Sequence, residues 1–189
     1  MRIGWIIVAI VAAIAIYAVV TYNRLVRLRN MVREGFSGVD VQLRRRTDLV
    51  PNLVDTVKAY AAHERGVFED VAATRASSMA ASDVHGQAAA ARALQAALGR
   101  LFALAEAYPQ LKADKNFLTL QDQLAEIEDQ LQMARRYYNG TVRDLNVAIQ
   151  SFPNSLVAGA FHFEPAAFFE LDDPAARAAP QVSFEPGKS

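Results

Sequence analysis

The sequence predicts an all-α protein: a long up-and-down antiparallel helical bundle whose first helix continues from an N-terminal transmembrane helix. Three observations predict it. Apolar residues recur every three or four positions from residue 124 to residue 152, the spacing of a helix with one buried face. Gly and Pro are scarce before residue 150, whereas Ala, Leu, Arg, Glu and Gln are common there. Residues 3–20 carry no charge at all.

Composition excludes several classes of function. The chain has 189 residues, which suits one domain with an appendage. Its 20 basic and 20 acidic residues balance, so net charge favours neither a nucleic acid nor an acidic substrate, and we expect no nucleic-acid partner. The absence of cysteine excludes disulfides, thiol chemistry and thiolate metal sites.

The first segment, residues 1–22, is predicted to be a transmembrane anchor. Its apolar run spans roughly 27 Å as a helix, close to the hydrocarbon thickness of a bilayer. A cleaved signal peptide is the alternative, since Ala13-Ile14-Ala15 resembles a cleavage site, but the apolar run continues past it to Val20. Aromatic residues stand where the membrane interfaces belong: Trp5, Tyr17 and Tyr22.

Arginines flank the anchor unequally. Arg2 precedes it, and four arginines follow it closely, so the positive-inside rule predicts an outside amino terminus and a cytoplasmic bundle. The same basic segment attracts anionic lipid, at about 1 kcal/mol per residue near the surface. The four are Arg24, Arg27, Arg29 and Arg33.

The bundle is predicted over residues 23–152. The first helix should leave the membrane without interruption and break at residues 47–51, because Pro51 disfavours helix at Val50 and Asp48 is a good N-cap. A second helix is then expected over about 49–80, a loop over 77–86 and a third helix over about 86–107. Asp114 or Asn116 should cap the fourth helix.

Charged residues within these helices allow two interpretations each. Arg44, Arg45 and Arg46 are expected to form a solvated helix face, rather than a lipid or nucleic-acid site. Glu64 interrupts the apolar stripe of the second helix, so its carboxylate lies either at the rim or buried against a cation. We predict the buried case, with a partner among three arginines of the fourth helix. These are Arg135, Arg136 and Arg143.

The fourth helix has a second, polar face formed by Arg136, Asn139 and Arg143, which lie three and four residues apart. We expect this polar face to contact either solvent or carboxylates of another helix. The tail that follows, residues 153–189, is acidic and rich in Phe. Six of the ten phenylalanines lie at or beyond residue 152. The tail is too apolar for disorder, so it should pack on the bundle, touch the membrane or bind a neighbour.

The sequence predicts no catalytic residue, no metal site and no cofactor. His63, His85 and His162 do not have metal-ligand spacing, and Gly-x-Ser-x-Gly is absent. The alternative is a membrane-tethered, metal-dependent hydrolase-like enzyme using His63, Glu64 and Asp144. That hypothesis requires the three side chains to converge in one cleft.

Several stretches, in order along almost the whole chain, match a known protein family. They are residues 22–30, 40–54, 98–101, 105–109, 134–139, 142–144, 152–153 and 168–170, with Arg177, Pro180 and Val182. On these stretches the chain resembles the LemA family. The resemblance implies a bacterial membrane protein with one N-terminal anchor, an outside amino terminus and a cytoplasmic bundle, and it implies a protein that is not an enzyme. Related proteins take part in building magnetosome membranes, which points to membrane organisation.

We therefore expect a scaffold or adaptor in the bacterial inner membrane, working as a homo-oligomer and with a protein partner that the sequence does not identify. Small residues in the anchor, Ala9, Ala12, Ala13 and Ala15, support self-association. The candidate interaction residues are Arg44, Arg45, Arg46, Asp48, Pro51, Glu64, Arg135, Arg136, Asn139, Arg143, Asp144, Phe168 and Phe169.

Overall fold

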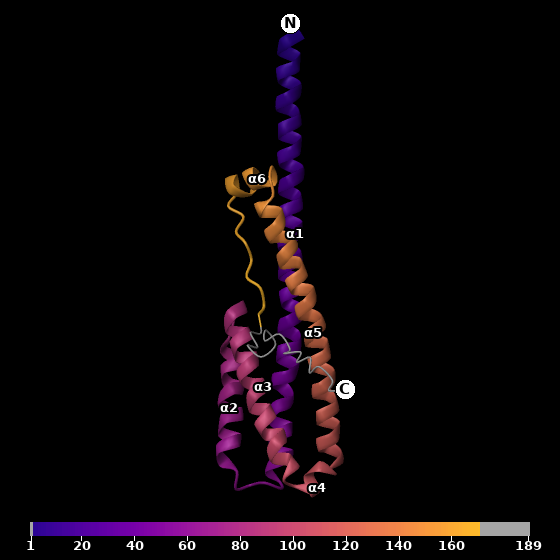
Figure 1. Ribbon diagram of the computed structural model, residues 1–189, viewed down its shortest axis with the longest axis vertical. Coiled ribbons are helices and arrows are strands. Elements are labelled where there is room, and N and C mark those ends of the chain that lie inside the picture. The colour runs from indigo at the N-terminus through magenta and orange to yellow at the C-terminus, as the bar shows by residue number, and fades with distance from the viewer. Residues whose placement is uncertain (1, 171–189) are drawn as a thin grey trace, which may run out of the picture.

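A computed structural model describes residues 2–170, and this part of the chain contains helices and no strand. The expectations for Arg177, Pro180, Val182 and the acidic end of the tail lie outside the described residues. The helices are α1 (Arg2–Lys58), α2 (Arg65–Ala80), α3 (Val84–Glu106), α4 (Pro109–Lys112), α5 (Lys115–Gln150) and α6 (Asn154–Ala160) (Figure 1). The predicted all-α antiparallel bundle is confirmed.

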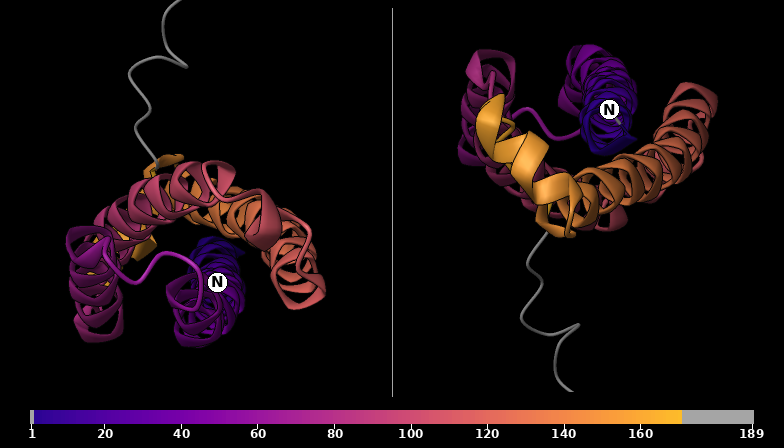
Figure 2. Two further views of the ribbon diagram at one scale, coloured as in Figure 1. Left: turned by 90° about the horizontal axis from the view of Figure 1, so that it is seen from below. Right: turned by 90° about the horizontal axis from the view of Figure 1, so that it is seen from above.

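Helix α1 is the long central helix against which α2, α3, α5 and α6 pack. It has 57 residues, which corresponds to a length of about 86 Å. Helix α5 packs antiparallel along the middle and lower parts of α1, while α2 and α3 form a shorter hairpin beside the lower half of α1 (Figure 1). Viewed along the long axis, α2, α3 and α5 form an arc, and α1 lies on its concave side (Figure 2). The N-terminal part of α1 projects alone, and its apolar window has no buried residue.

Two apolar cores follow one another along the bundle. The core far from the N-terminus joins the end of α1 to α2, α3, α4 and the start of α5. The core nearer the N-terminus joins α1 to the start of α3, to the second half of α5, to α6 and to the chain beyond α6. The first core includes Leu53, Val71, Leu94, Leu101, Leu111 and Phe117; the second includes Leu25, Val39, Leu131, Tyr138, Leu145 and Phe169.

The predicted break at residues 47–51 is wrong, because α1 passes through Pro51 to Lys58. Proline cannot donate to the carbonyl four residues earlier, which belongs to Thr47. That carbonyl accepts a hydrogen bond from Arg75 Nε of α2 instead, at 3.1 Å. The orphaned acceptor is therefore satisfied by a tertiary contact. Asp48 lies exposed inside α1 rather than at an N-cap, and the chain leaves the helix only after Lys58.

The predicted start of the second helix at about residue 49 is also wrong, because α2 begins at Arg65. The boundaries after α2 lie close to the predicted ones. The loop between α2 and α3 occupies residues 81–83, and the Asp83 carboxylate caps α3 by accepting a hydrogen bond from the Gly86 N–H at 2.8 Å. Asp114 caps α5, as predicted, accepting from the N–H groups of Asn116 and Phe117 at 2.8 and 3.1 Å. The Phe117 N–H and the hydroxyl of Tyr60 lower the pKa of the Asp114 carboxyl.

Gly35 lies where α1 and α5 approach each other closely. A Cβ atom at this position would lie 3.1 Å from the Cα atom of Tyr138 and 3.4 Å from Thr141 Oγ1. The nearest atom belongs to the backbone of α5, so it cannot move away as a flexible side chain would. The absence of a side chain at Gly35 therefore permits the close contact of the two long helices at this point.

We expect Gly35→Ala to destabilise the bundle even though alanine favours a helix over glycine by about 1 kcal/mol. The reason is that overpacking of this kind costs about 1–3 kcal/mol. The matched control is Gly38→Ala, one turn further on, where nothing lies within 4 Å of the added Cβ; it should be stabilising. Thermal melting of the full-length protein in detergent, followed by circular dichroism, separates the two. A higher melting temperature for both variants would contradict the close contact.

Candidate functional site

The candidate site is the face of α5 that holds residues 163–170 in extended form. The chain reverses after α6 through a left-handed residue, His162, with φ 53°. The Phe163 N–H donates to the Ala158 carbonyl at 2.9 Å, and the His162 N–H donates to the Gly159 carbonyl at 3.3 Å. This is the Schellman pattern of a helix C-terminus. It sends the chain back from α6 along the bundle (Figure 1).

Two asparagines of α5 bind the backbone of this segment. Asn146 donates from Nδ2 to the Ala166 carbonyl at 2.9 Å and accepts from the Ala166 N–H at Oδ1, at 2.8 Å. Asn139 does the same with Phe169, at 3.1 and 2.9 Å. Each carboxamide therefore supplies the donor and the acceptor that a neighbouring β-strand would supply.

The two pairs match in register. Asn139 and Asn146 are seven residues apart, so they lie two turns apart on one face and about 10.5 Å apart along the axis. Ala166 and Phe169 are three residues apart, which corresponds to about 10 Å in an extended chain. Because the spacings agree, both carboxamides bind at once without bending the segment.

Side chains fix the segment between and beyond these pairs. The buried Tyr138 donates from its hydroxyl to the Ala167 carbonyl at 2.7 Å, and burial raises the pKa of this phenol. Phe169 is 1% exposed, and the Arg135 guanidinium carbon lies 5.4 Å from the centroid of its ring. Burial lowers the pKa of Arg135, an effect that Glu128 opposes.

The predicted polar face of the fourth helix is only partly in this site. Asn139 binds the backbone of the extended segment, a partner different from both solvent and carboxylates. Arg136, Arg143 and Asp144 are exposed. Phe168 is 37% exposed, whereas its neighbour Phe169 belongs to the core.

The three consecutive arginines of α1 have different environments. Arg44 is exposed and pairs with Asp40 at 2.9 Å, and Arg45 is exposed beside Gln42. Arg46 is buried and its Nη1 lies 3.2 Å from Glu128 Oε2 on α5. Burial lowers the pKa of Arg46, and the opposite charge of Glu128 raises it by a smaller amount. The prediction of a solvated face is therefore wrong for Arg46.

Arg46 belongs to a polar layer between the two apolar cores. Its side chain reaches the space between α3 and α5, which Leu98, Phe102 and Leu124 also line. Thr47 and Gln87 are buried in the same region, and Gln87 Nε2 donates to Asp40 at 2.9 Å. A polar layer of this kind favours a single register of the helices, since sliding would leave the charges unpaired.

The prediction for Glu64 is wrong. Glu64 is exposed, immediately precedes α2, and makes no capping hydrogen bond with its side chain. No ion pair joins it to Arg135, Arg136 or Arg143 in the described part of the chain. The prediction extended a helical period through residues 59–64, where the chain is not helical.

The three residues of the enzyme hypothesis do not converge. His63 and Glu64 lie in the loop between α1 and α2, at the end of the bundle near α4, whereas Asp144 lies in the last turns of α5, toward α6 (Figure 1). Within residues 2–170, no group of three or more His, Asp or Glu side chains is placed to hold a metal ion. The hypothesis thereby loses the geometry on which it depended.

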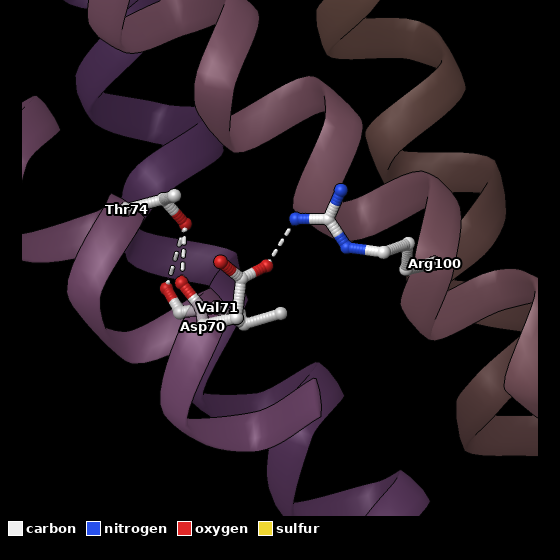
Figure 3. A network of polar contacts seen from close by, with 4 residues as sticks. All are labelled: Asp70, Val71, Thr74 and Arg100. Carbon is white, nitrogen blue, oxygen red and sulfur yellow. Dashed lines mark hydrogen bonds and ion pairs between the residues drawn. The ribbon is translucent and has the colours of Figure 1, made fainter. Parts of the chain in front are cut away.

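The ion pair of Asp70 with Arg100, between α2 and α3, provides a contrast to the buried pair (Figure 3). Its side chains are 40% and 56% exposed. The Thr74 hydroxyl lies nearby but donates to the backbone carbonyls of Asp70 and Val71, at 2.9 and 3.1 Å. This pair is open to water and should contribute little to stability.

Comparison with known proteins gives a consistent family assignment. A family model described as the LemA family matches residues 35–184. Magnetosome proteins MamQ 1 and MamQ 2 of Paramagnetospirillum magneticum are each 23% identical over 192 residues, covering 87% of this chain and 71% of the relative. Magnetosome protein MamQ of Magnetospirillum gryphiswaldense is 25% identical over 174 residues, covering 78% and 64%.

Proposed function

Because the chain belongs to the LemA family, we propose that it is a membrane-anchored helical scaffold or adaptor of the bacterial inner membrane rather than an enzyme. The observation that carries this proposal is the continuity of α1. One helix contains both a segment long and apolar enough to cross a membrane and the central helix of the bundle. The bundle is therefore joined to the membrane segment without a flexible linker, which suits a protein that positions others.

Self-association is part of the proposal. The alanines of the apolar segment at positions 9, 12, 13 and 15 are exposed, and small residues let membrane helices approach closely. Residues 163–170 lie on α5 of their own chain, so we assign self-association to the anchor rather than to this segment. The relatives are named magnetosome proteins, and we carry over from them only a role in organising a membrane-bound assembly.

We propose an outside amino terminus and a cytoplasmic bundle, because four arginines follow the apolar segment between residues 24 and 33. The same arginines suit contact with anionic lipid. A reporter that works only in the cytoplasm should be active when fused after Ser189. A reporter that works only in the periplasm should be inactive at the same position. The control replaces Arg24, Arg27, Arg29 and Arg33 by glutamine and adds arginines beside Arg2, which should invert or mix the topology. Activity of a periplasmic reporter on the unaltered sequence would contradict the orientation. Loss of the first 20 residues from the mature protein would show a signal peptide instead.

A further inference from the structure

Helix α6 lies level with the end of the apolar segment of α1. The Tyr17 hydroxyl donates to Asn154 Oδ1 at 2.7 Å, and Tyr17 lies inside the apolar run that ends at Val20. Five residues further on, the ring of Tyr22 lies 4.8 Å from the ring of Phe161. Helix α6 lies across the axis of α1 at this height, and beyond it α1 continues alone (Figure 1).

The surface around α6 is apolar and exposed. Phe152, Leu156 and Phe161 are 81%, 65% and 56% exposed, while Val157 and Ala158 of the same helix are buried against the bundle. No Asp, Glu, Lys or Arg occurs between Asp144 and Glu164. A patch of this kind is unfavourable in water, and burial in lipid would leave no charge to be desolvated.

Cationic residues lie on the side of α6 that faces the bundle. Arg29 is placed over the ring of Phe163, with its guanidinium carbon 5.1 Å from the centroid. At the start of α6, Arg24 lines a pocket together with Asn154, Arg143 and Asp144, so two arginines and one carboxylate lie there. Apolar residues at one level and arginines just below it reproduce the order of acyl chains and phosphates in a leaflet.

We propose that α6, with Phe152, Leu156 and Phe161, is a second membrane-contact element that enters the leaflet on the side of the bundle. The proposal rests on the proposed function in one respect, that α1 crosses a bilayer. The occupant of the exposed surface is then lipid, because the surface is continuous with the apolar part of α1 and held to it by Tyr17. Inserted on one side of α1 and in one leaflet only, α6 acts as a wedge and also fixes the rotation of α1 about its axis.

The absence of cysteine allows a direct test with single-cysteine variants of the full-length protein. Leu156→Cys and Phe161→Cys, labelled with an environment-sensitive fluorophore, report on the α6 surface. Ile10→Cys reports on the anchor. Met133→Cys is the matched control, since it is 48% exposed on α5 and about 26 Å from the end of that helix. The labelled proteins are reconstituted in vesicles of phosphatidylcholine and phosphatidylglycerol that carry a spin-labelled quencher at a shallow or a deep acyl position.

We expect the labels at 156 and 161 to be quenched most by the shallow quencher, the label at 10 by the deep one, and the label at 133 by neither. If the label at 10 is quenched but the labels at 156 and 161 are quenched no more than the label at 133, the inference about α6 is overturned and the anchor is retained. No quenching at 10 would overturn the anchor and the inference with it. The labels at 156 and 161 could instead report an apolar environment that becomes more marked as the protein-to-lipid ratio rises, while the lipid quencher has no effect on them. That result would show a protein partner at this surface and would overturn lipid as its occupant.

Discussion

Phe169→Ala is expected to release residues 163–170 from α5 and to lower the free energy of unfolding by about 3 kcal/mol, as large-to-small substitutions of buried phenylalanine do. The side chain is almost fully buried in the core nearer the N-terminus. Its removal also deprives Arg135 of the ring beneath its guanidinium group. The Asn139 hydrogen bonds to the backbone remain available, but they have to hold a segment that has lost its anchor side chain.

The adjacent residue provides the control. Phe168→Ala removes a side chain of the same size that is more than a third exposed, so it should cost much less. Thermal melting in detergent gives the global effect, for which 3 kcal/mol corresponds to a fall of roughly 6–12 °C. Hydrogen exchange of the Ala166 and Phe169 amides gives the local effect. Equal losses for the two variants, or slow exchange retained in Phe169→Ala, would contradict the docking of this segment.

Glu128→Ala is the second substitution with a large expected effect. It leaves the Arg46 guanidinium in the polar layer between the cores without its counter-charge. Removing one partner of a fully buried pair costs about 3–5 kcal/mol; we expect about 2–3 kcal/mol, because the Glu128 side chain keeps 27% of its surface exposed.

Two comparisons separate the effect of charge from that of packing. Asp70→Ala breaks the exposed pair with Arg100, and should cost about 0–1 kcal/mol (Figure 3). The double replacement of Arg46 by Met and Glu128 by Leu should recover most of the stability lost in Glu128→Ala, since it removes both charges. Urea titration of the full-length protein in detergent gives the differences. A Glu128→Ala variant as stable as Asp70→Ala would show that Arg46 reaches water.

The sequence predicts the long helices well, because their determinants are local. The apolar stripe of α5 and the cap at Asp114 are both properties of neighbouring residues. The prediction of a break at Pro51 failed because its outcome depends on a distant residue. The acceptor that Pro51 leaves free is satisfied by Arg75, which is 28 residues away from Thr47 in the sequence. No local pattern reveals such a partner, and the prediction for Glu64 then inherited the wrong helix boundaries.

The candidate site was predictable only in part. Asn139 stood out on the polar face of its helix, but its partner is the backbone of Phe169, and a backbone group has no signature in the sequence. Asn146 was missed, although its spacing of seven from Asn139 was a usable signal. Arg46 differs from Arg44 and Arg45 in its position, three residues after Leu43 and four before Val50, on the buried face of α1. That spacing indicated burial, but it could not identify the partner, Glu128 of α5.

We propose that the protein is a membrane-anchored scaffold that associates with itself through α1. Counting of subunits by single-molecule photobleaching, with the full-length protein in lipid vesicles, tests it most directly. We expect several chains in each assembly, persisting as the lipid is increased, and fewer when Ala9 and Ala13 are both replaced by isoleucine; Val11→Ile, at an exposed position of the same segment, should leave the count unchanged. A single chain per vesicle at every protein-to-lipid ratio would contradict the claim.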